Sequence, residues 1–114
     1  MHSPDPAKYD RLAEVIREAS AVFIESETNG GSLITVTRVE LTDNLKKAII
    51  FVTVMPESKS DEAIAFLRRL RGDIHHDLVK NHRLPRAPMI DIMLDAGEKH
   101  RMHIEQLLKD IETK

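Results

Sequence analysis

One stretch of the sequence, KKAIIFVTVM (Lys46 to Met55), is apolar at nearly every position. Its β-branched residues predict a strand that is central in its sheet or largely buried on both faces. The stretch LITVTRVEL before it predicts a second strand, and TDNL between the two predicts a tight turn, so we expect a β-hairpin. Val36 and Val39 are out of phase for strict alternation, which predicts a bulge near Thr37–Arg38.

Apolar residues at three- and four-residue steps predict helices on both sides of this hairpin. The first helix begins at Asp5-Pro6, a capping residue followed by a proline, and ends near the glycines of ETNGGS. After the hairpin a second apolar stripe continues through Gly72, which predicts a kink there rather than the end of the helix. This stripe contains Ile64, Leu67, Leu70, Ile74 and Leu78.

PRAP ends this helical region, MIDIMLD alternates as a strand does, and EKHRMHIEQLLKDIETK predicts a short closing helix. The predicted order is α-β-β-α-(kink)-α-β-α. A helical crossover between the second and third strands favours a parallel pair. We therefore expect an α+β fold with a three-stranded mixed sheet and helices packed on one face. A chain of 114 residues fits one domain, with 5–112 folded and 1–4 as a disordered N-terminus.

Several classes of protein find no support in this composition. The chain has no cysteine, hence neither a disulfide framework nor a cysteine nucleophile. It has no long apolar run for a membrane span and no signal peptide, so a cytoplasmic protein is expected. The adjacent glycines precede a strand, so no phosphate-binding loop is indicated. His100 and His103 are three residues apart, but nothing else nearby has metal-ligand spacing. We predict no catalytic residue, metal, cofactor, small-molecule substrate or membrane partner.

Charge is unevenly distributed along the chain. Its formal net charge is −2. From Arg68 to Arg86, however, six lysines or arginines stand against Asp73 and Asp77, giving +4 before histidines are counted and leaving −6 for the remainder. This segment is either an ordinary solvated helix surface or a face that binds a polyanion. The candidate RNA-binding residues are Arg68, Arg69, Arg71, Gly72, His75, His76, Lys80, Arg83 and Arg86.

Gly72 suggests how this segment could bind a polyanion. A glycine leaves room for a phosphate or sugar to approach the backbone at the kink, where N–H groups can point outward. KH modules use a helix–glycine–helix element beside a small sheet to clamp a single strand of nucleic acid. On this interpretation Arg68, Arg71 and His75 form one row of side chains and Arg69, His76, Lys80 and Arg83 a flanking row.

From about Tyr9 to Ile111 the sequence resembles the ribosome-binding factor A family. The most specific parts are TRVELTDNLKKAIIFVTVM, Thr37 to Met55, and the Pro-x-Ile-x-Ile-x-x-Asp run from Pro88 to Asp95. The resemblance implies a type II KH-like fold in which an Ala-x-Gly kink replaces the usual Gly-x-x-Gly loop. Here the kink reads Leu70-Arg71-Gly72, His75 stands where the family usually has arginine, and the chain is acidic where most members are basic.

The resemblance also implies a partner and a role. It predicts binding to the free small (30S) ribosomal subunit and to 16S rRNA, with help in late maturation and 5′-end processing of that RNA. We expect a non-enzymatic, monomeric RNA-binding assembly factor. Two alternatives remain open: a KH-like module that binds a protein partner through its acidic remainder, and a small enzyme whose site the sequence does not display.

Overall fold

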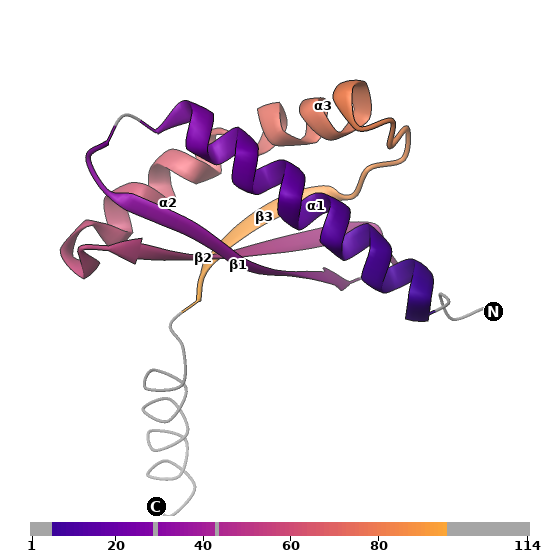
Figure 1. Ribbon diagram of the computed structural model, residues 1–114, viewed down its shortest axis with the longest axis horizontal. Helices are drawn as coiled ribbons and strands as arrows, with labels where there is room; N and C mark the ends of the chain where they lie inside the picture. Colours follow the sequence, from indigo (N-terminus) through magenta and orange to yellow (C-terminus); the bar gives the residue numbers. More distant parts are fainter. Residues whose placement is uncertain (1–5, 29, 43, 96–114) are drawn as a thin grey trace, which may run out of the picture.

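The computed structural model describes residues 6–28, 30–42 and 44–95. The elements follow in the order α1 (Pro6–Glu27), β1 (Leu33–Thr42), β2 (Lys47–Met55), a short 3-10 turn η1 (Glu57–Lys59), α2 (Ser60–Arg69), α3 (Arg71–Asn81) and β3 (Met89–Leu94) (Figure 1). The predicted α+β order is confirmed over this part of the chain. The Asp5 cap, the closing helix and the His100/His103 pair lie outside the described residues.

The sheet has three strands in the order β1-β2-β3, with β1 antiparallel and β3 parallel to the central β2. This confirms the hairpin, the central place of the apolar strand and the parallel crossover. Val36 pairs with Val52, and Arg38 pairs with the next β2 residue, Phe51, so Thr37 is the extra residue of a bulge. The bulge therefore lies where the break in alternation between Val36 and Val39 predicted it.

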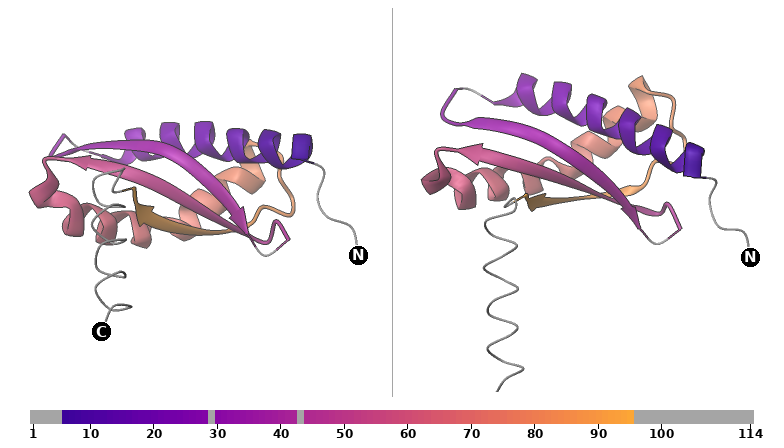
Figure 2. Two further views of the ribbon diagram at one scale, coloured as in Figure 1. Left: turned by 90° about the horizontal axis from the view of Figure 1, so that it is seen from below. Right: turned by 60° about the horizontal axis from the view of Figure 1, so that its bottom comes forward.

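The helices cover one face of the sheet. In Figures 1 and 2, α1 lies beside β1, while α2 and α3 lie beside β3. Alternate residues of β2 are buried beneath them, while the residues between these are only partly buried or exposed. The core contains Ile16, Ala19, Ile24, Val36, Val39, Leu41, Ala48, Ile50, Val52, Val54, Ala63, Leu67, Ile74, Leu78, Ile90 and Ile92. No described helix covers the opposite face.

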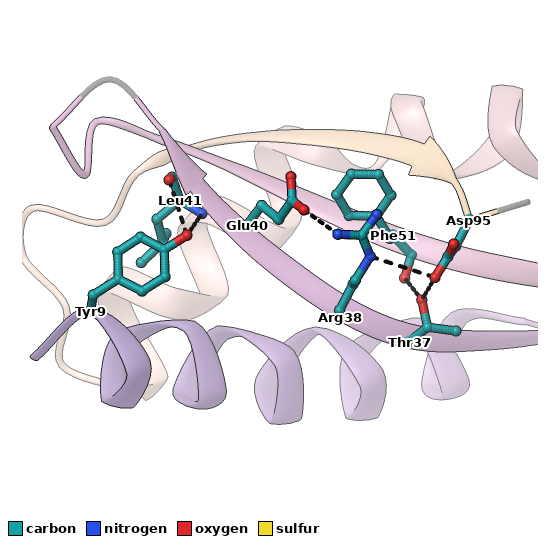
Figure 3. Close-up of polar contacts among 7 residues, drawn as sticks. All are labelled: Tyr9, Thr37, Arg38, Glu40, Leu41, Phe51 and Asp95. Carbon is teal, nitrogen blue, oxygen red and sulfur yellow. Dashed lines mark hydrogen bonds and ion pairs between the residues drawn. The ribbon is translucent and has the colours of Figure 1, made fainter. Parts of the chain in front are cut away.

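Polar side chains hold β1 in place (Figure 3). The Tyr9 hydroxyl donates to the Leu41 carbonyl at 3.2 Å and accepts from the Leu41 N–H at 3.0 Å. At the bulge, the Thr37 hydroxyl donates to Asp95 Oδ2 at 2.6 Å. The first contact ties α1 to an edge strand, and the second ties the bulge to the residue that follows β3.

The predicted break in the helix exists, but it is centred on Leu70 rather than on Gly72. Leu70 lies between α2 and α3 with φ −91° and ψ 0°, and its N–H bonds to the Leu67 carbonyl at 3.0 Å. Its side chain packs against the core, so the backbone turns here while the apolar stripe stays buried. Gly72 follows in the first turn of α3, and a Cβ added to it would meet nothing within 4 Å.

Candidate nucleic-acid interface

Nine basic or potentially basic residues surround the helix break, line α3 and continue into the loop before β3. We call them the basic surface: Arg68, Arg69, Arg71, His75, His76, Lys80, His82, Arg83 and Arg86. All are exposed except His75, which is partly buried. Three of them, Arg68, Arg71 and His75, contact β3 or the loop before it.

Arg68 and Arg71 lie at the edge of the sheet. A guanidinium nitrogen of Arg68 donates to the Ile92 carbonyl of β3 at 3.4 Å. Arg71 Nε donates to the Arg68 carbonyl at 3.0 Å, so the break itself positions the second guanidinium. Because β3 is an edge strand with helices on one face only, these cations stand beside backbone that no further described strand covers. KH modules clamp the backbone of single-stranded nucleic acid with a short glycine-containing loop.

Sequence reasoning left two residues beside this edge, Asp91 and Lys47, out of the candidate set. Asp91 Oδ1 accepts from the Ile92 N–H at 2.8 Å and lies 3.6 Å from Arg71 Nη1. Its other oxygen, Oδ2, lies 3.8 Å from Lys47 Nζ. An acidic residue within the otherwise apolar MIDIML strand was the available signal, but the parallel register of β2 and β3 was needed to place Lys47 beside it.

Arg69 does not join this group. It lines a hollow of about 320 Å³ with residues from the end of α1, the start of β1 and α2, among them Glu27, Ile34 and Phe66. Arg69 therefore lies near the end of α1, whereas Arg71 lies beside Asp91 of β3. The predicted flanking row from Arg69 to His76 assumed one continuous helix, and the turn at Leu70 interrupts it.

The three histidines have different surroundings. His75 Nε2 lies 3.1 Å from the Ala87 carbonyl, a contact that ties α3 to the loop before β3. His82 Nε2 lies 3.3 Å from Asp77 Oδ2. His76 is exposed and has no hydrogen bond or ion pair to a described residue.

Lys80, Arg83 and Arg86 are exposed, and none forms an ion pair with another described residue. Arg83 has φ +55°, a left-handed conformation of the kind that often ends a helix. The Leu84 N–H then bonds to the Leu78 carbonyl at 3.1 Å, which fixes the loop against α3. Three cations are therefore held on an ordered backbone with their charge available to a partner.

The pair of Glu14 and Arg17 on α1 contrasts with these cations. Arg17 Nε donates to Glu14 Oε2 at 3.0 Å. This hydrogen bond lowers the pKa of the Glu14 carboxyl and raises that of the Arg17 guanidinium. The two charges satisfy each other, so this part of α1 offers little free charge to a polyanion.

Other kinds of site find no support within the described ranges. No group of three or more histidine, cysteine or acidic residues there could hold a metal ion. None of the helices described is both long enough and apolar enough to cross a membrane. The four aromatic residues, Tyr9, Phe23, Phe51 and Phe66, are all partly buried. A base-stacking platform would need exposed rings, so charge and shape are what this surface offers.

Comparison with known proteins points in one direction. A sequence profile of the family described as Ribosome-binding factor A matches residues 8–108. Ribosome-binding factor A of Desulfitobacterium hafniense (strain DSM 10664 / DCB-2) is 31% identical over 105 residues, covering 90% of this chain and 84% of that protein. The Coprothermobacter proteolyticus protein of the same name is 28% identical over 111 residues, covering 96% of this chain and 81% of that protein.

Solved structures show the same fold. The crystal structure of ribosome-binding factor A from Thermus thermophilus superimposes with a TM-score of 0.69 at 20% identity, covering 79% of this chain and 98% of that chain. A Thermotoga maritima protein solved by NMR gives a TM-score of 0.66 at 22% identity, covering 85% of this chain and 95% of that chain. The overall fold is therefore one that solved structures already show.

Proposed function

Because the chain belongs to the ribosome-binding factor A family, we propose that it is a ribosome-associated assembly factor that binds the free small (30S) ribosomal subunit. In this role it assists late maturation and 5′-end processing of 16S rRNA. It acts in the cytoplasm as a monomeric, single KH-like RNA-binding domain, and it positions RNA without catalysing a reaction. The observation that carries the proposal is the set of exposed cations around the helix break, beside the uncovered edge of β3.

The chemistry of this surface favours contacts to the RNA backbone. Arginine and lysine neutralise phosphates regardless of the base they carry. The partly buried aromatic side chains leave little for stacking on bases. Arg68, Arg71, Lys80, Arg83 and Arg86 are the phosphate contacts that we propose, with His75, His76 and Gly72 next to them and Arg69 at the margin of the site. Specificity would then come from the shape of the folded RNA.

The test is salt-dependent binding to a transcript of the 5′ region of 16S rRNA. If about five cations reach phosphates, log K against log[salt] has a slope of roughly −3.5 to −4.5. A protein of the same net charge but another fold is the control and should show no comparable slope. A flat slope for this chain would contradict RNA binding and favour a protein partner recognised through its acidic remainder.

A cryo-microscopy map of the chain on a precursor small subunit tests the orientation. We expect α3, the edge of β3 and the adjoining part of the uncovered sheet face, where Asp91 and Lys47 lie, to face ribosomal RNA. A map in which the basic surface contacts only solvent would overturn the assignment of these residues, even if the chain were bound to the subunit.

A further inference from the structure

One carboxylate lies inside the proposed RNA-binding surface. Asp91 projects from the middle of β3, and its side chain is 29% exposed. Its oxygens lie 3.6 Å from a guanidinium nitrogen of Arg71 and 3.8 Å from the ammonium nitrogen of Lys47. The two cations come from the start of α3 and the start of β2 and are both about half exposed. Asp91 is thus an anion held between two cations from different elements.

Neighbouring hydrogen bonds fix these side chains beside β3. Arg71 is fixed by its hydrogen bond to the Arg68 carbonyl, and Arg68 in turn reaches the Ile92 carbonyl. The Ile92 N–H donates to Asp91 Oδ1 at 2.8 Å. A strip of charge therefore follows the edge of β3. A carboxylate has two oxygens that share its negative charge, and the two non-bridging oxygens of a phosphodiester are similar. Two cations that bind the first group could therefore also bind the second.

We propose that Asp91 occupies, in the free protein, the position that an RNA phosphate takes between Arg71 and Lys47, and that it thereby sets the selectivity of this surface. The inference rests on the proposed function. A phosphate that enters must displace Asp91 from both cations, and the carboxylate then remains nearby as a repelling charge. Such a built-in repulsion disfavours the wrong partners more than the right one.

The repulsion by Asp91 should make affinity depend on how many phosphates an RNA presents at the same time. A short, flexible RNA offers one or two phosphates at a time, and the repulsion by Asp91 offsets much of their attraction. A folded RNA engages Arg71 together with Lys80, Arg83 and Arg86, so the same repulsion is a smaller share of its total binding. Asp91 should therefore matter more for unstructured RNA than for the folded small-subunit RNA.

Asp91→Asn isolates the charge, because the amide oxygen of asparagine can still accept from the Ile92 N–H. Each partly exposed ion pair is worth up to about 1 kcal/mol, so the variant should bind the 5′-region transcript roughly threefold to tenfold more tightly. Binding to a single-stranded oligouridylate should tighten more, and the ratio of the two affinities should fall. Because the phosphate takes this position in the parent as well, the number of phosphate contacts is unchanged, and the salt slope should stay close to the parent's.

Asp73→Asn is the matched control. Asp73 lies in the first turn of α3, is exposed, and forms no ion pair with Arg71 or Lys47. Its replacement makes the same change in net charge without freeing either cation, so it measures the general field effect. A double-mutant cycle with Arg71→Gln then tests the contact itself. In the Arg71→Gln background only the contact with Lys47 remains, so Asp91→Asn should have a smaller effect than it has in the parent.

The outcomes separate the inference from the function. If the parent shows salt-dependent RNA binding but Asp91→Asn behaves as Asp73→Asn does, the role of Asp91 is wrong and the function stands. If neither the parent nor Asp91→Asn binds the transcript in a salt-dependent way, the proposed function fails and the inference fails with it. Thermal unfolding of each variant controls for folding, and Asp91→Thr, a residue that suits a strand, replaces Asp91→Asn in the comparison if the latter does not fold.

Discussion

Arginines serve different purposes in two regions of this molecule. On the face of the sheet that the helices leave uncovered, Arg38 forms ion pairs with Glu40 and Asp95, and its guanidinium lies 3.9 Å from the centre of the Phe51 ring (Figure 3). On the basic surface, Arg83 and Arg86 form no ion pair with a described residue. The first arginine holds the fold together, and the others leave their charge available to a partner.

The difference shows that a count of charges does not locate a binding face. Arg38 is surrounded by charge of the opposite sign, so a polyanion gains little by approaching it. The edge of β3 is intermediate, because Asp91 already partners Arg71 and Lys47. The comparison predicts that effects on RNA binding and effects on stability come from different residues. Changes on the basic surface should alter binding and spare stability, and changes around Arg38 should do the reverse.

The largest expected effect comes from replacing Arg68, Arg71 and Lys80 together by glutamine. Losing about three phosphate contacts should flatten the salt slope by two to three units and weaken binding on the order of 100-fold near 0.1 M salt. Because all three side chains are exposed, the melting temperature should hardly change. Filter binding over a salt series and thermal unfolding measure the two quantities.

The control is a triple variant that removes Lys8, Arg11 and Arg17 from α1, with the same change in net charge. It should keep the parent's slope and lose only a little affinity. If the two triple variants weaken binding equally, the charge acts through the overall field and the basic surface is not a site. An unchanged slope in the first variant would centre the interface away from these three residues, for instance on Lys46 and Lys47 at the hairpin.

Arg38→Met should show the opposite behaviour. It removes two partly exposed ion pairs and the cation from the Phe51 ring, so we expect a loss of about 1–2 kcal/mol in the free energy of unfolding. RNA affinity should remain within about twofold of the parent, since Arg38 is already neutralised by Glu40 and Asp95. Chemical denaturation measures the first quantity, with Arg11→Met as the surface control. A tenfold loss of binding by a folded Arg38→Met would extend the interface across the uncovered sheet face to Arg38.

The fold could be predicted from the sequence because each of its elements has a local signal. The apolar run before Met55 identifies the central strand. Val36 and Val39 break the two-residue alternation of a strand, and this break predicts the bulge at Thr37. The helix break was also predicted: the apolar stripe placed it at Gly72, because glycine weakens a helix, and the family resemblance placed it within Leu70-Arg71-Gly72. The turn falls at Leu70 because the backbone must bend where the buried stripe passes from α2 to α3, and local propensity does not reveal that position.

The candidate site was less predictable, because it depends on contacts distant in sequence. Periodicity placed Arg69 in a row with His76, yet the turn at Leu70 places Arg69 beside the end of α1 instead. Lys47 and Asp91 are separated by 44 residues and meet only through the parallel register of β2 and β3. The sequence shows where basic residues are concentrated along the chain. The ion pairs formed in the folded protein determine how many of those charges are free to bind a partner.

Gly72→Ala tests the remaining role of the glycine. The added Cβ has open space within the protein, so no internal obstruction requires a glycine here, and stability should rise by about 0.5–1 kcal/mol. Binding should nevertheless weaken severalfold if an RNA phosphate approaches the backbone here. Gly30→Ala is the contrasting control. Gly30 has φ +84°, so that variant should lose about 1–2 kcal/mol of stability and keep its RNA affinity. A Gly72→Ala protein that melts higher and binds normally would make Gly72 an ordinary helical residue.

The smallest effect concerns the histidines of the basic surface. Protonated imidazole is a cation, and the phosphates of a bound RNA favour that form, so binding should take up protons near neutral pH. Affinity should then rise as the pH falls from about 8 to 6. Replacing His75, His76 and His82 by glutamine removes the titration and should flatten this dependence.

The structure sharpens that expectation residue by residue. His75 contacts the Ala87 carbonyl, and His82 already has the Asp77 carboxylate as its partner. A bound phosphate should therefore make His82 contribute least to the pH dependence of binding. It should make His76 contribute most, because His76 is exposed and has no described partner. His76→Gln alone should remove more of the pH dependence than His82→Gln, measured as the affinity ratio between pH 6 and pH 8. If the triple variant keeps the parent's ratio, the histidines are bystanders and the arginines alone distinguish this surface from the paired charges around Arg38.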